Sequence, residues 1–175
     1  MYRTHNLGEL RIENVNQEVE LSGWVQKIRN LGGMIFIDLR DQFGITQIVI
    51  NDEKMQEQVK NVPTESCIHI CGNVVERSSK NPKMPTGDIE VVANKFEILG
   101  KCKNVLPFEI NTDQEVREDL RLEYRFLDLR NEKLHNIILL RSKILKTLRD
   151  KMDELGFAEI QTPILANSSP EGARD

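Results

Sequence analysis

The stretch that decides the fold runs from Glu18 to Ile50 and reads EVELSGWVQKIRNLGGMIFIDLRDQFGITQIVI. Residues 18–25, 34–40 and 44–50 are rich in Val, Ile and aromatic side chains, and polar and apolar residues alternate through the first two. Alternation with a period of two is typical of half-buried β-strands. The Gly32-Gly33 pair is a turn signal between the first two segments. The stretch therefore predicts three consecutive strands.

Further along the chain, the pattern changes to a short helix and then returns to strands. A polar segment over residues 52–62 predicts a helix, capped by Asn51 or Asp52 and ended by Pro63. Two more strands are expected over residues 67–76 and 89–99, joined by the proline- and glycine-containing loop 77–87. Three strands, a helix and two strands is the order of an all-β OB-fold, a five-stranded Greek-key barrel. A generic small sandwich is the alternative, and the helix after the third strand favours the barrel.

Beyond residue 104 the chain is predicted to be mainly helical. Residues 100–112 resemble a linker, residues 113–129 predict one helix or two short ones, and residues 132–155 predict the longest helix. Asn131 is positioned to cap this helix and Gly156 to end it. Its apolar residues fall on one stripe, formed by Ile137, Leu140, Ile144, Leu148, Met152 and Leu155.

After this helix, residues 157–161 have the composition of a strand. The stripe has little to pack against within residues 105–175, so we expect the chain to be the first part of a larger protein.

Composition excludes several classes of protein. The 175 residues are 39% apolar and 30% charged, which is ordinary for a soluble globular chain. No apolar run approaches the roughly 18–20 residues of a membrane span, and no secretory signal opens the chain. The three cysteines argue against a disulfide framework and favour a reducing cytosol. The net charge of -4 disfavours nucleic-acid binding by bulk positive charge but permits recognition of RNA through local contacts.

Several side chains suit the binding of single-stranded nucleic acid by the second and third strands and the neighbouring loops of an OB-fold. Ile35, Ile37 and Leu39 share one parity and predict the core face, which leaves Phe36 on the outer face with Asp38 and Arg40, where its ring can stack on a base. Arg29, expected to open the first loop, and Gln47, on the third strand, offer hydrogen bonds to a base edge. Residues Arg77, Lys80, Asn81 and Lys83 lie in the predicted loop 77–87. For Phe36, stacking on a base is favoured over a place in the core. Each of the other residues alone is more simply explained as solvated surface, and it is their combination on these elements that favours binding.

No metal site or complete catalytic site is predicted. Cys67, His69 and Cys71 alternate along one strand, where successive positions on one face lie about 6–7 Å apart, too far for one ion. Ordinary strand residues are the better interpretation. The P-loop, GxSxG and HExxH motifs are all missing from the sequence.

Two neighbouring segments late in the chain read GFAEIQTPIL (residues 156–165) and SPEGARD (residues 169–175). The first resembles motif 1 of class II aminoacyl-tRNA synthetases, and the second is similar to the segment that follows motif 1 in the aspartyl-tRNA synthetase family. Residues 125–130, RFLDLR, resemble a stretch that the aspartyl and lysyl enzymes share, with Phe126 in place of the usual Tyr. Segments of the predicted barrel resemble the anticodon-binding domain of the same subclass: residues 21–25, 36–41 and 44–47.

This resemblance implies how the barrel recognises RNA. Residues 1–104 would bind the anticodon loop of an aspartate tRNA, whose bases are G (or queuosine), U and C. Phe36 would stack on the central U, while Arg29 and Gln47 read its edge. Glu90 would accept hydrogen bonds from the first base, and Arg77 and Asn81 would contact the anticodon from their loop.

The resemblance also assigns roles to the rest of the chain. Residues 105–130 would form a helical hinge, and residues 131–175 the start of an α+β catalytic domain. Pro163 and the long helix would lie in a homodimer interface, and Glu171 near the ammonium group of the aspartate substrate. The complete cytoplasmic enzyme would use ATP and Mg²⁺ to join aspartate to its tRNA. Because the ATP-binding motifs 2 and 3 of the family are not among these residues, we expect no catalytic residue and no aminoacylation by this stretch alone.

Two other interpretations stay open. One is a non-catalytic OB-fold module that binds single-stranded nucleic acid, although it needs neither the motif 1 helix nor the PEGARD run. The other is a ligase for lysine or asparagine. Whether aspartate tRNA alone or also asparagine tRNA is charged is open as well, and Leu31, where some relaxed relatives carry His, favours strict recognition.

Overall fold

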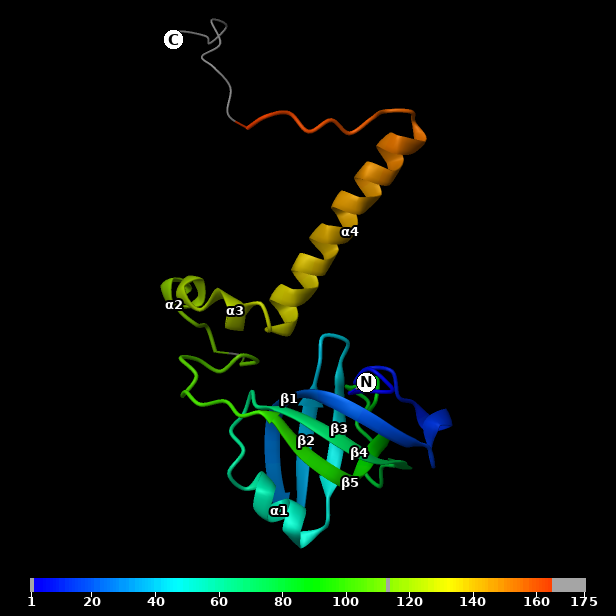
Figure 1. The fold of residues 1–175 in the computed structure, drawn as a ribbon, viewed down its shortest axis with the longest axis vertical. Helices are drawn as coiled ribbons and strands as arrows, with labels where there is room; N and C mark the ends of the chain where they lie inside the picture. The colour runs from blue at the N-terminus through cyan, green and yellow to red at the C-terminus, as the bar shows by residue number, and fades with distance from the viewer. Residues whose placement is uncertain (1, 113, 165–175) are drawn as a thin grey trace, which may run out of the picture. The chain divides into compact units, whose positions relative to one another are not determined.

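The computed structural model describes residues 2–112 and 114–164. The chain divides into two compact units, Met1–Leu106 and Pro107–Asp175. Figure 1 traces the first unit from blue to green and the second from green to red. None of the described helices has the length and apolar character needed to cross a membrane. The predicted division at residues 104 and 130 into barrel, hinge and catalytic start stays a prediction.

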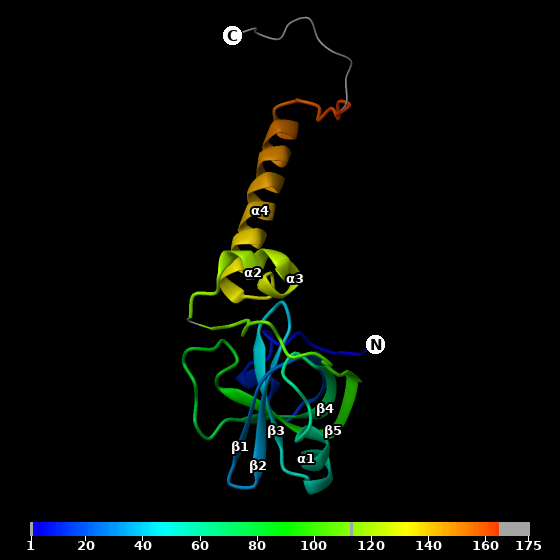
Figure 2. The ribbon, with the colours of Figure 1, turned by 90° about the vertical axis from the view of Figure 1, so that its left-hand side faces the viewer.

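The first unit is a five-stranded barrel, which confirms the predicted OB-fold. Its strands close in the order β1-β2-β3-β5-β4, with every neighbouring pair antiparallel except β3 and β5 (Figures 1 and 2). Because the sheet closes on itself, each strand has a hydrogen-bonded neighbour on both sides, which suits a small isolated sheet. The strands are β1 (Glu18–Leu31), β2 (Met34–Arg40), β3 (Ile45–Ile50), β4 (Cys67–Glu76) and β5 (Ile89–Gly100).

The predicted helix between the third and fourth strands is present as α1 (Glu53–Val59). Of the two candidate caps the structure selects Asp52, whose side chain accepts a hydrogen bond from the Met55 amide at 2.9 Å. Val59 and Val62, at the end of the helix and just after it, are buried against the barrel core. A short 3₁₀ turn, η1 (Ile12–Asn14), precedes β1.

The first hairpin turns later than the sequence suggested. Gly32 and Gly33 have φ angles of +59° and +87°, the backbone region that glycine adopts without steric cost. Because both turn residues are glycines, pairing runs right up to them, and Leu31 lies opposite Met34. Arg29, expected to open a loop, is therefore a strand residue that pairs with Phe36.

The core follows the alternation of the strands. Ile35, Ile37 and Leu39 of β2 are buried, and the intervening Phe36 and Asp38 are only partly buried. On β1, β4 and β5 the same rule selects inward residues that include Val19, Leu21, Val25, Ile68, Ile70, Val74, Ile89 and Val91. In β3 every residue from Thr46 to Ile50 is buried. This parity fixes which side chains lie on the outside of the barrel.

The N-terminal segment packs against the barrel, a feature that alternation did not reveal. Leu7 and Leu10 are fully buried in the core cluster. The Leu7 amide donates to Asp41 Oδ2 at 3.0 Å, and its carbonyl accepts from Thr46 Oγ1 at 2.6 Å. These bonds satisfy the backbone that the burial of Leu7 removes from water.

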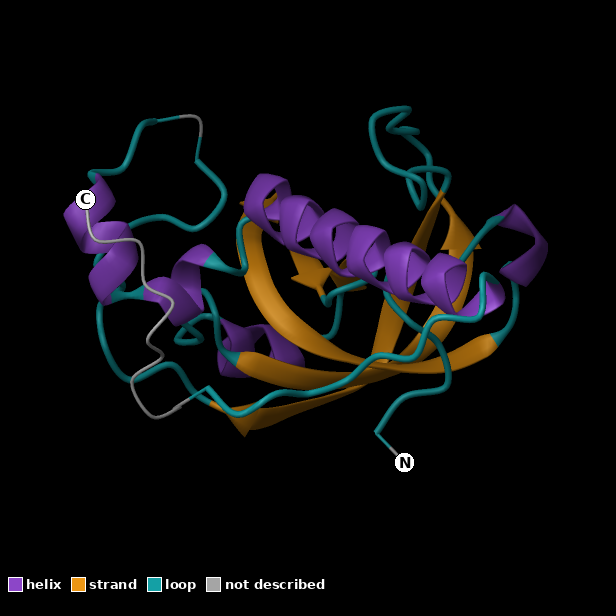
Figure 3. Cartoon of the chain, turned by 90° about the horizontal axis from the view of Figure 1, so that it is seen from above, coloured by secondary structure: helices purple, strands orange, loops and turns teal. Residues whose placement is uncertain are grey.

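The second unit contains α2 (Glu118–Glu123), α3 (Arg125–Asp128) and α4 (Glu132–Glu154), drawn as purple helices in Figure 3. The buried Asp128 accepts from Arg121 Nε at 2.9 Å and from Arg125 Nη1 at 2.8 Å, so the RFLDLR segment ties the two short helices together. Asn131 caps α4 by accepting from the amides of Lys133 and Leu134.

The structure confirms the predicted end of α4, whereas the strand predicted directly after it is wrong. Gly156, with φ +81°, ends the helix in a Schellman arrangement in which the Phe157 amide bonds the Met152 carbonyl. Residues 157–161, predicted to be strand-like, form no strand. A strand needs the backbone groups of a neighbouring strand, and the described part of the second unit contains none.

We predict that Ile37→Ala lowers the free energy of unfolding of the barrel by about 2–5 kcal/mol, because it leaves a cavity in the closed core. Urea unfolding followed by the fluorescence of the single tryptophan, Trp24, measures this. Met34→Ala, at the 42%-exposed start of the same strand, is the matched control and should change stability by much less. Equal effects of the two substitutions would contradict the core assignment.

Candidate nucleic-acid interface

The outer face of β2 and β3 carries the predicted stacking residue. Phe36 is half-buried between its register partners Arg29 on β1 and Val49 on β3. The Cβ atoms of directly opposite residues in a sheet lie about 4.5–5.5 Å apart, so the Phe36 ring has a neighbouring side chain on each side. Two residues further along β2, on the same face, Asp38 lies opposite Gln47 of β3.

A hydrogen-bond network joins the polar side chains of this face. Arg29 Nη2 donates to Asp38 Oδ1 at 2.6 Å and to Gln47 Oε1 at 3.1 Å. Gln47 Oε1 also accepts from Arg77 Nη2 at 2.9 Å, and Gln47 Nε2 donates to Glu90 Oε2 at 2.7 Å. Four of the six predicted RNA-binding residues therefore meet in one place, beside Phe36.

Barrel closure brings these side chains together from four different parts of the first unit. Arg29 lies on β1 and Gln47 on β3, while Arg77 directly follows β4 and Glu90 is the second residue of β5. The parallel pairing of Ile48 with Val91 places Gln47 beside Glu90, one position earlier on each strand. Residues separated by up to 61 positions thus form one polar surface.

The amide orientation of Gln47 follows from its neighbours. An arginine only donates and a carboxylate only accepts, so the Gln47 oxygen must face Arg29 and Arg77, and its nitrogen must face Glu90. Gln47 is 5% exposed, and both lone pairs of its oxygen are occupied. One N–H of the amide is left, so Gln47 can still donate to a ligand.

The charges of the network nearly balance. Arg29 and Arg77 converge on one oxygen of Gln47, and Asp38 and Glu90 supply the compensating negative charges. Burial raises the pKa of the Asp38 carboxyl above its usual value, and the positive charges of Arg29, Arg77 and Lys27 oppose that shift. The face therefore presents directed hydrogen-bonding groups rather than an excess of positive charge.

The remaining predicted RNA-binding residue, Asn81, lies outside this network. Its side chain accepts from the Lys83 amide at 3.1 Å, and its backbone bonds Gly87 and Met84, so it shapes the loop between β4 and β5. Lys80, in the same loop, pairs with Glu76 at 2.8 Å.

The prediction that Arg40 shares the outer face with Phe36 is wrong, because Arg40 is buried. Its Nη2 lies 2.9 Å from both carboxylate oxygens of Glu65, in the loop between α1 and β4. Parity alone did not reveal this, because the loop that covers the end of β2 comes from a distant part of the sequence.

The predicted dimer-interface and aspartate-binding residues both belong to the C-terminal part of the chain. Pro163 is exposed in the second unit. Glu171 and the SPEGARD segment lie outside the described residues.

Cys67, His69 and Cys71 occupy alternate positions of β4, and His69 is hydrogen-bonded to Ser22 Oγ at 3.1 Å. In the described ranges, no group of three His, Cys, Asp or Glu side chains is arranged to hold a metal ion.

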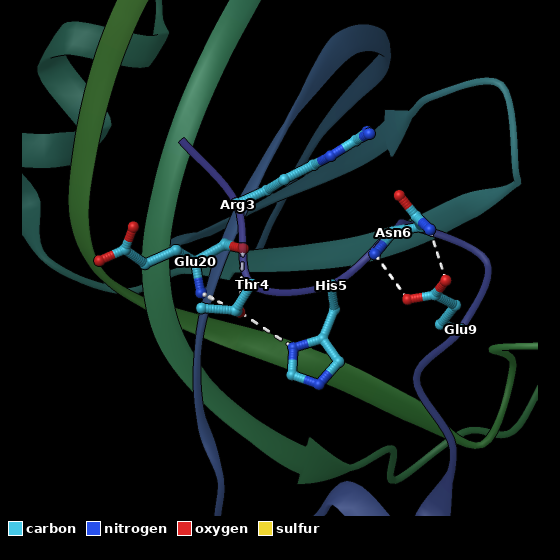
Figure 4. Close-up of a pocket in the computed structure, with 6 residues that line it drawn as sticks. All are labelled: Arg3, Thr4, His5, Asn6, Glu9 and Glu20. Atoms are coloured by element: carbon cyan, nitrogen blue, oxygen red, sulfur yellow. Dashed lines mark hydrogen bonds between the residues drawn. The ribbon is translucent and has the colours of Figure 1, made fainter. Parts of the chain in front are cut away.

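A separate hollow of about 450 Å³ lies along the N-terminal segment (Figure 4). Its polar groups are paired with one another: Thr4 Oγ1 with His5 Nδ1 and the Glu20 amide, and Glu9 with the amide and side chain of Asn6. The hydrogen bonds from Asn6 lower the pKa of the Glu9 carboxyl. The Thr4–Glu20 hydrogen bond joins the segment to β1, and we assign the hollow no ligand.

Comparison with protein families divides the chain in the same way as its architecture. Residues 19–99 match the OB-fold nucleic acid binding domain of the tRNA anticodon-binding family. Residues 117–175 match the class II tRNA synthetases of the D, K and N type.

Relatives match the chain over its whole length. The aspartate–tRNA(Asp/Asn) ligase of Gluconobacter oxydans is 51% identical, over 99% of this chain and 29% of that protein. The aspartate–tRNA ligase of Mesoplasma florum is 49% identical, over 100% of this chain and 30% of that protein. The chain thus spans about 30% of the length of these relatives.

Solved structures show the same architecture. Asparaginyl-tRNA synthetase from Pyrococcus horikoshii, complexed with asparaginyl-adenylate, superposes with a TM-score of 0.82 at 28% identity, over 99% of this chain and 39% of that one. Aspartyl-tRNA synthetase from Entamoeba histolytica reaches 0.86 at 22% identity, over 95% and 41%, which shows the fold alone. From both domain matches and the relatives together, the chain belongs to the class II tRNA synthetases of the aspartate, lysine and asparagine group, and it corresponds to the N-terminal part of the aspartate–tRNA ligases.

Proposed function

We propose that the barrel binds the anticodon loop of an aspartate tRNA, as part of an enzyme that attaches aspartate to that tRNA. The observation that carries this proposal is the network of Arg29, Gln47, Arg77 and Glu90 beside the ring of Phe36. It combines a stacking platform with fixed donors and an acceptor, the combination by which proteins read unstacked bases.

The chemistry of the network suits the anticodon GUC. Phe36 stacks on the central U, and the free donors of Arg29 and Gln47 face the carbonyl oxygens on its edge. Glu90 Oε2 accepts from Gln47, which leaves the other carboxylate oxygen to accept from N1–H and N2–H of the first base, a guanine. Arg77 and the loop shaped by Asn81 contact the anticodon backbone.

In the complete enzyme, aspartate and ATP would form aspartyl-adenylate and pyrophosphate, and the aspartyl group would then pass to the tRNA. Glu171 is proposed to lie near the aspartate ammonium, and Mg²⁺ to neutralise the phosphates of ATP. We place the enzyme in the cytoplasm.

A second copy of the chain is proposed to cover α4. The stripe of Ile137, Leu140, Ile144, Leu148, Met152 and Leu155 is 46–61% exposed. A row of apolar side chains at three- and four-residue steps on a 23-residue helix is typical of a buried helix face. Pro163, shortly after the helix, is proposed to lie in the same homodimer interface.

The stacking role of Phe36 predicts a loss of RNA affinity. Phe36→Ala should weaken binding of a GUC anticodon stem-loop by about 5- to 150-fold, the cost of one lost base–aromatic stack. Titration of the labelled stem-loop at fixed moderate salt measures this, with a UUU stem-loop as the weaker ligand. Phe43→Ala, 53% exposed in the turn after β2, is the control and should keep the affinity. Unchanged binding by a folded Phe36→Ala would remove the site from β2.

The assignment of Glu90 predicts a change in specificity. Glu90→Gln should weaken GUC binding by about 10- to 150-fold, the worth of a hydrogen bond to a charged group, while AUC binding changes little. Adenine lacks the N1–H and N2–H donors of guanine, so it loses nothing when the carboxylate is replaced. Glu97→Gln, exposed on the same strand, should affect neither loop. An equal loss for both loops would exclude recognition of the first base by Glu90.

The homodimer predicts a change in sedimentation. The chain should sediment as a dimer, and Leu148→Asp should convert it to a monomer, because it places a carboxylate within the apolar stripe. Lys143→Asp, which alters an exposed polar position on the same helix, should leave the dimer intact. Sedimentation velocity measures all three proteins, and a monomeric parent chain would refute the proposed interface.

A further inference from the structure

Asp38 is an unexpected residue on a surface proposed to bind RNA. Its side chain is 19% exposed, close to the ring of Phe36 along the same face of β2. A carboxylate there repels phosphate and weakens the general attraction of the protein for RNA. Burial also disfavours its ionised form, as the raised pKa of Asp38 indicates. A specific benefit must offset these two costs.

The position of Arg29 depends on Asp38. In the register of the barrel Arg29 lies opposite Phe36, yet its guanidinium reaches diagonally past the ring to Asp38 and Gln47. Arg29 Nε is buried without a hydrogen-bond partner among the described residues. The two bonds of Nη2 are therefore the contacts that orient the guanidinium.

Charge repulsion makes Gln47 alone insufficient to hold Arg29. Arg77 donates to the same Gln47 oxygen, so two guanidinium groups lie within a few ångströms of each other. Lys27 lies directly opposite Asp38 and adds a third positive charge. Asp38 is the carboxylate in direct contact with Arg29, at 2.6 Å. Without it, repulsion would turn Arg29 away from the ring and into solvent.

We propose that Asp38 is a positioning residue for recognition of the central anticodon base: it holds Arg29 beside Phe36 so that Nη1 points at the edge of the stacked base. This inference rests on the proposed function. With Nη2 occupied by Asp38 and Gln47, Nη1 is free to donate to a carbonyl oxygen of uracil. Cytosine presents an amino group where uracil has O4, so a fixed donor discriminates between them. Asp38 thus reduces general affinity for RNA and increases selectivity for U.

The proposal predicts that one substitution affects two RNA loops differently. Asp38→Ala should weaken binding of the GUC stem-loop by about tenfold, because the charge-assisted bond that orients Arg29 is lost. The same substitution should leave binding of a GCC stem-loop unchanged or slightly tighter, because a negative charge has been removed. Asp38→Asn, which keeps one oxygen to accept from Arg29, should retain part of the preference for GUC. Titration of both loops at one fixed salt concentration measures these effects.

A double-mutant cycle tests whether Asp38 acts through Arg29. In an Arg29→Met background, Asp38→Ala should no longer change the ratio of GUC to GCC affinity. Glu53→Ala removes the same charge from the exposed first turn of α1 and should leave the ratio unchanged in either background. Thermal melting followed by Trp24 fluorescence confirms that each variant is folded.

Three results would overturn these statements, and they can be told apart. A parent chain that binds GUC and GCC equally would refute the proposed recognition of the central base itself. A clear preference that a folded Asp38→Ala retains would refute only the role of Asp38. An equal loss for both loops, or one that persists in the Arg29→Met background, would show that Asp38 acts on the fold and not through Arg29.

Discussion

The parallel pairing of β3 with β5 is the constraint on which the rest of the first unit depends. Only Ile48–Val91 and Val49–Val92 form this pairing, yet it closes the sheet into a barrel. Closure places one set of alternating residues in a core sealed from water and the other set on the outside. It also places Glu90 beside Gln47, and so completes the polar face that neither strand carries alone.

That polar face reconciles the acidic character of the chain with the RNA binding proposed for it. The formal net charge is -4, and within the network two arginines are balanced by two carboxylates. A neutral network attracts phosphate only weakly, but its donors and acceptors are fixed in direction before a ligand arrives. Side chains that are already ordered lose less conformational entropy on binding than free ones. Such a surface favours discrimination among a few bases over strong general affinity.

The second unit is governed by a different constraint, the apolar stripe of α4. Helix α4 has defined ends, with Asn131 at its start and Gly156 in a Schellman arrangement at its end. Its stripe is nevertheless exposed in the described part of the unit. Local capping thus explains where the helix begins and ends. Burial of its apolar face requires contact with further protein. We propose that a second copy of the chain provides this contact.

The sequence by itself determined the order of the elements and the faces of the strands. The alternation of Ile35, Ile37 and Leu39 identified the core side of β2, and Asn131 and Gly156 marked the ends of α4, because these signals act between near neighbours in the chain. Tertiary structure alone decided the burial of Arg40 against Glu65, the packing of Leu7 in the core and the absence of a strand over residues 157–161. It also brought Arg29, Asp38, Gln47, Arg77 and Glu90 into one network. Each of these outcomes depends on segments distant in the sequence, and the backbone pairing that joins them leaves no local pattern in either segment.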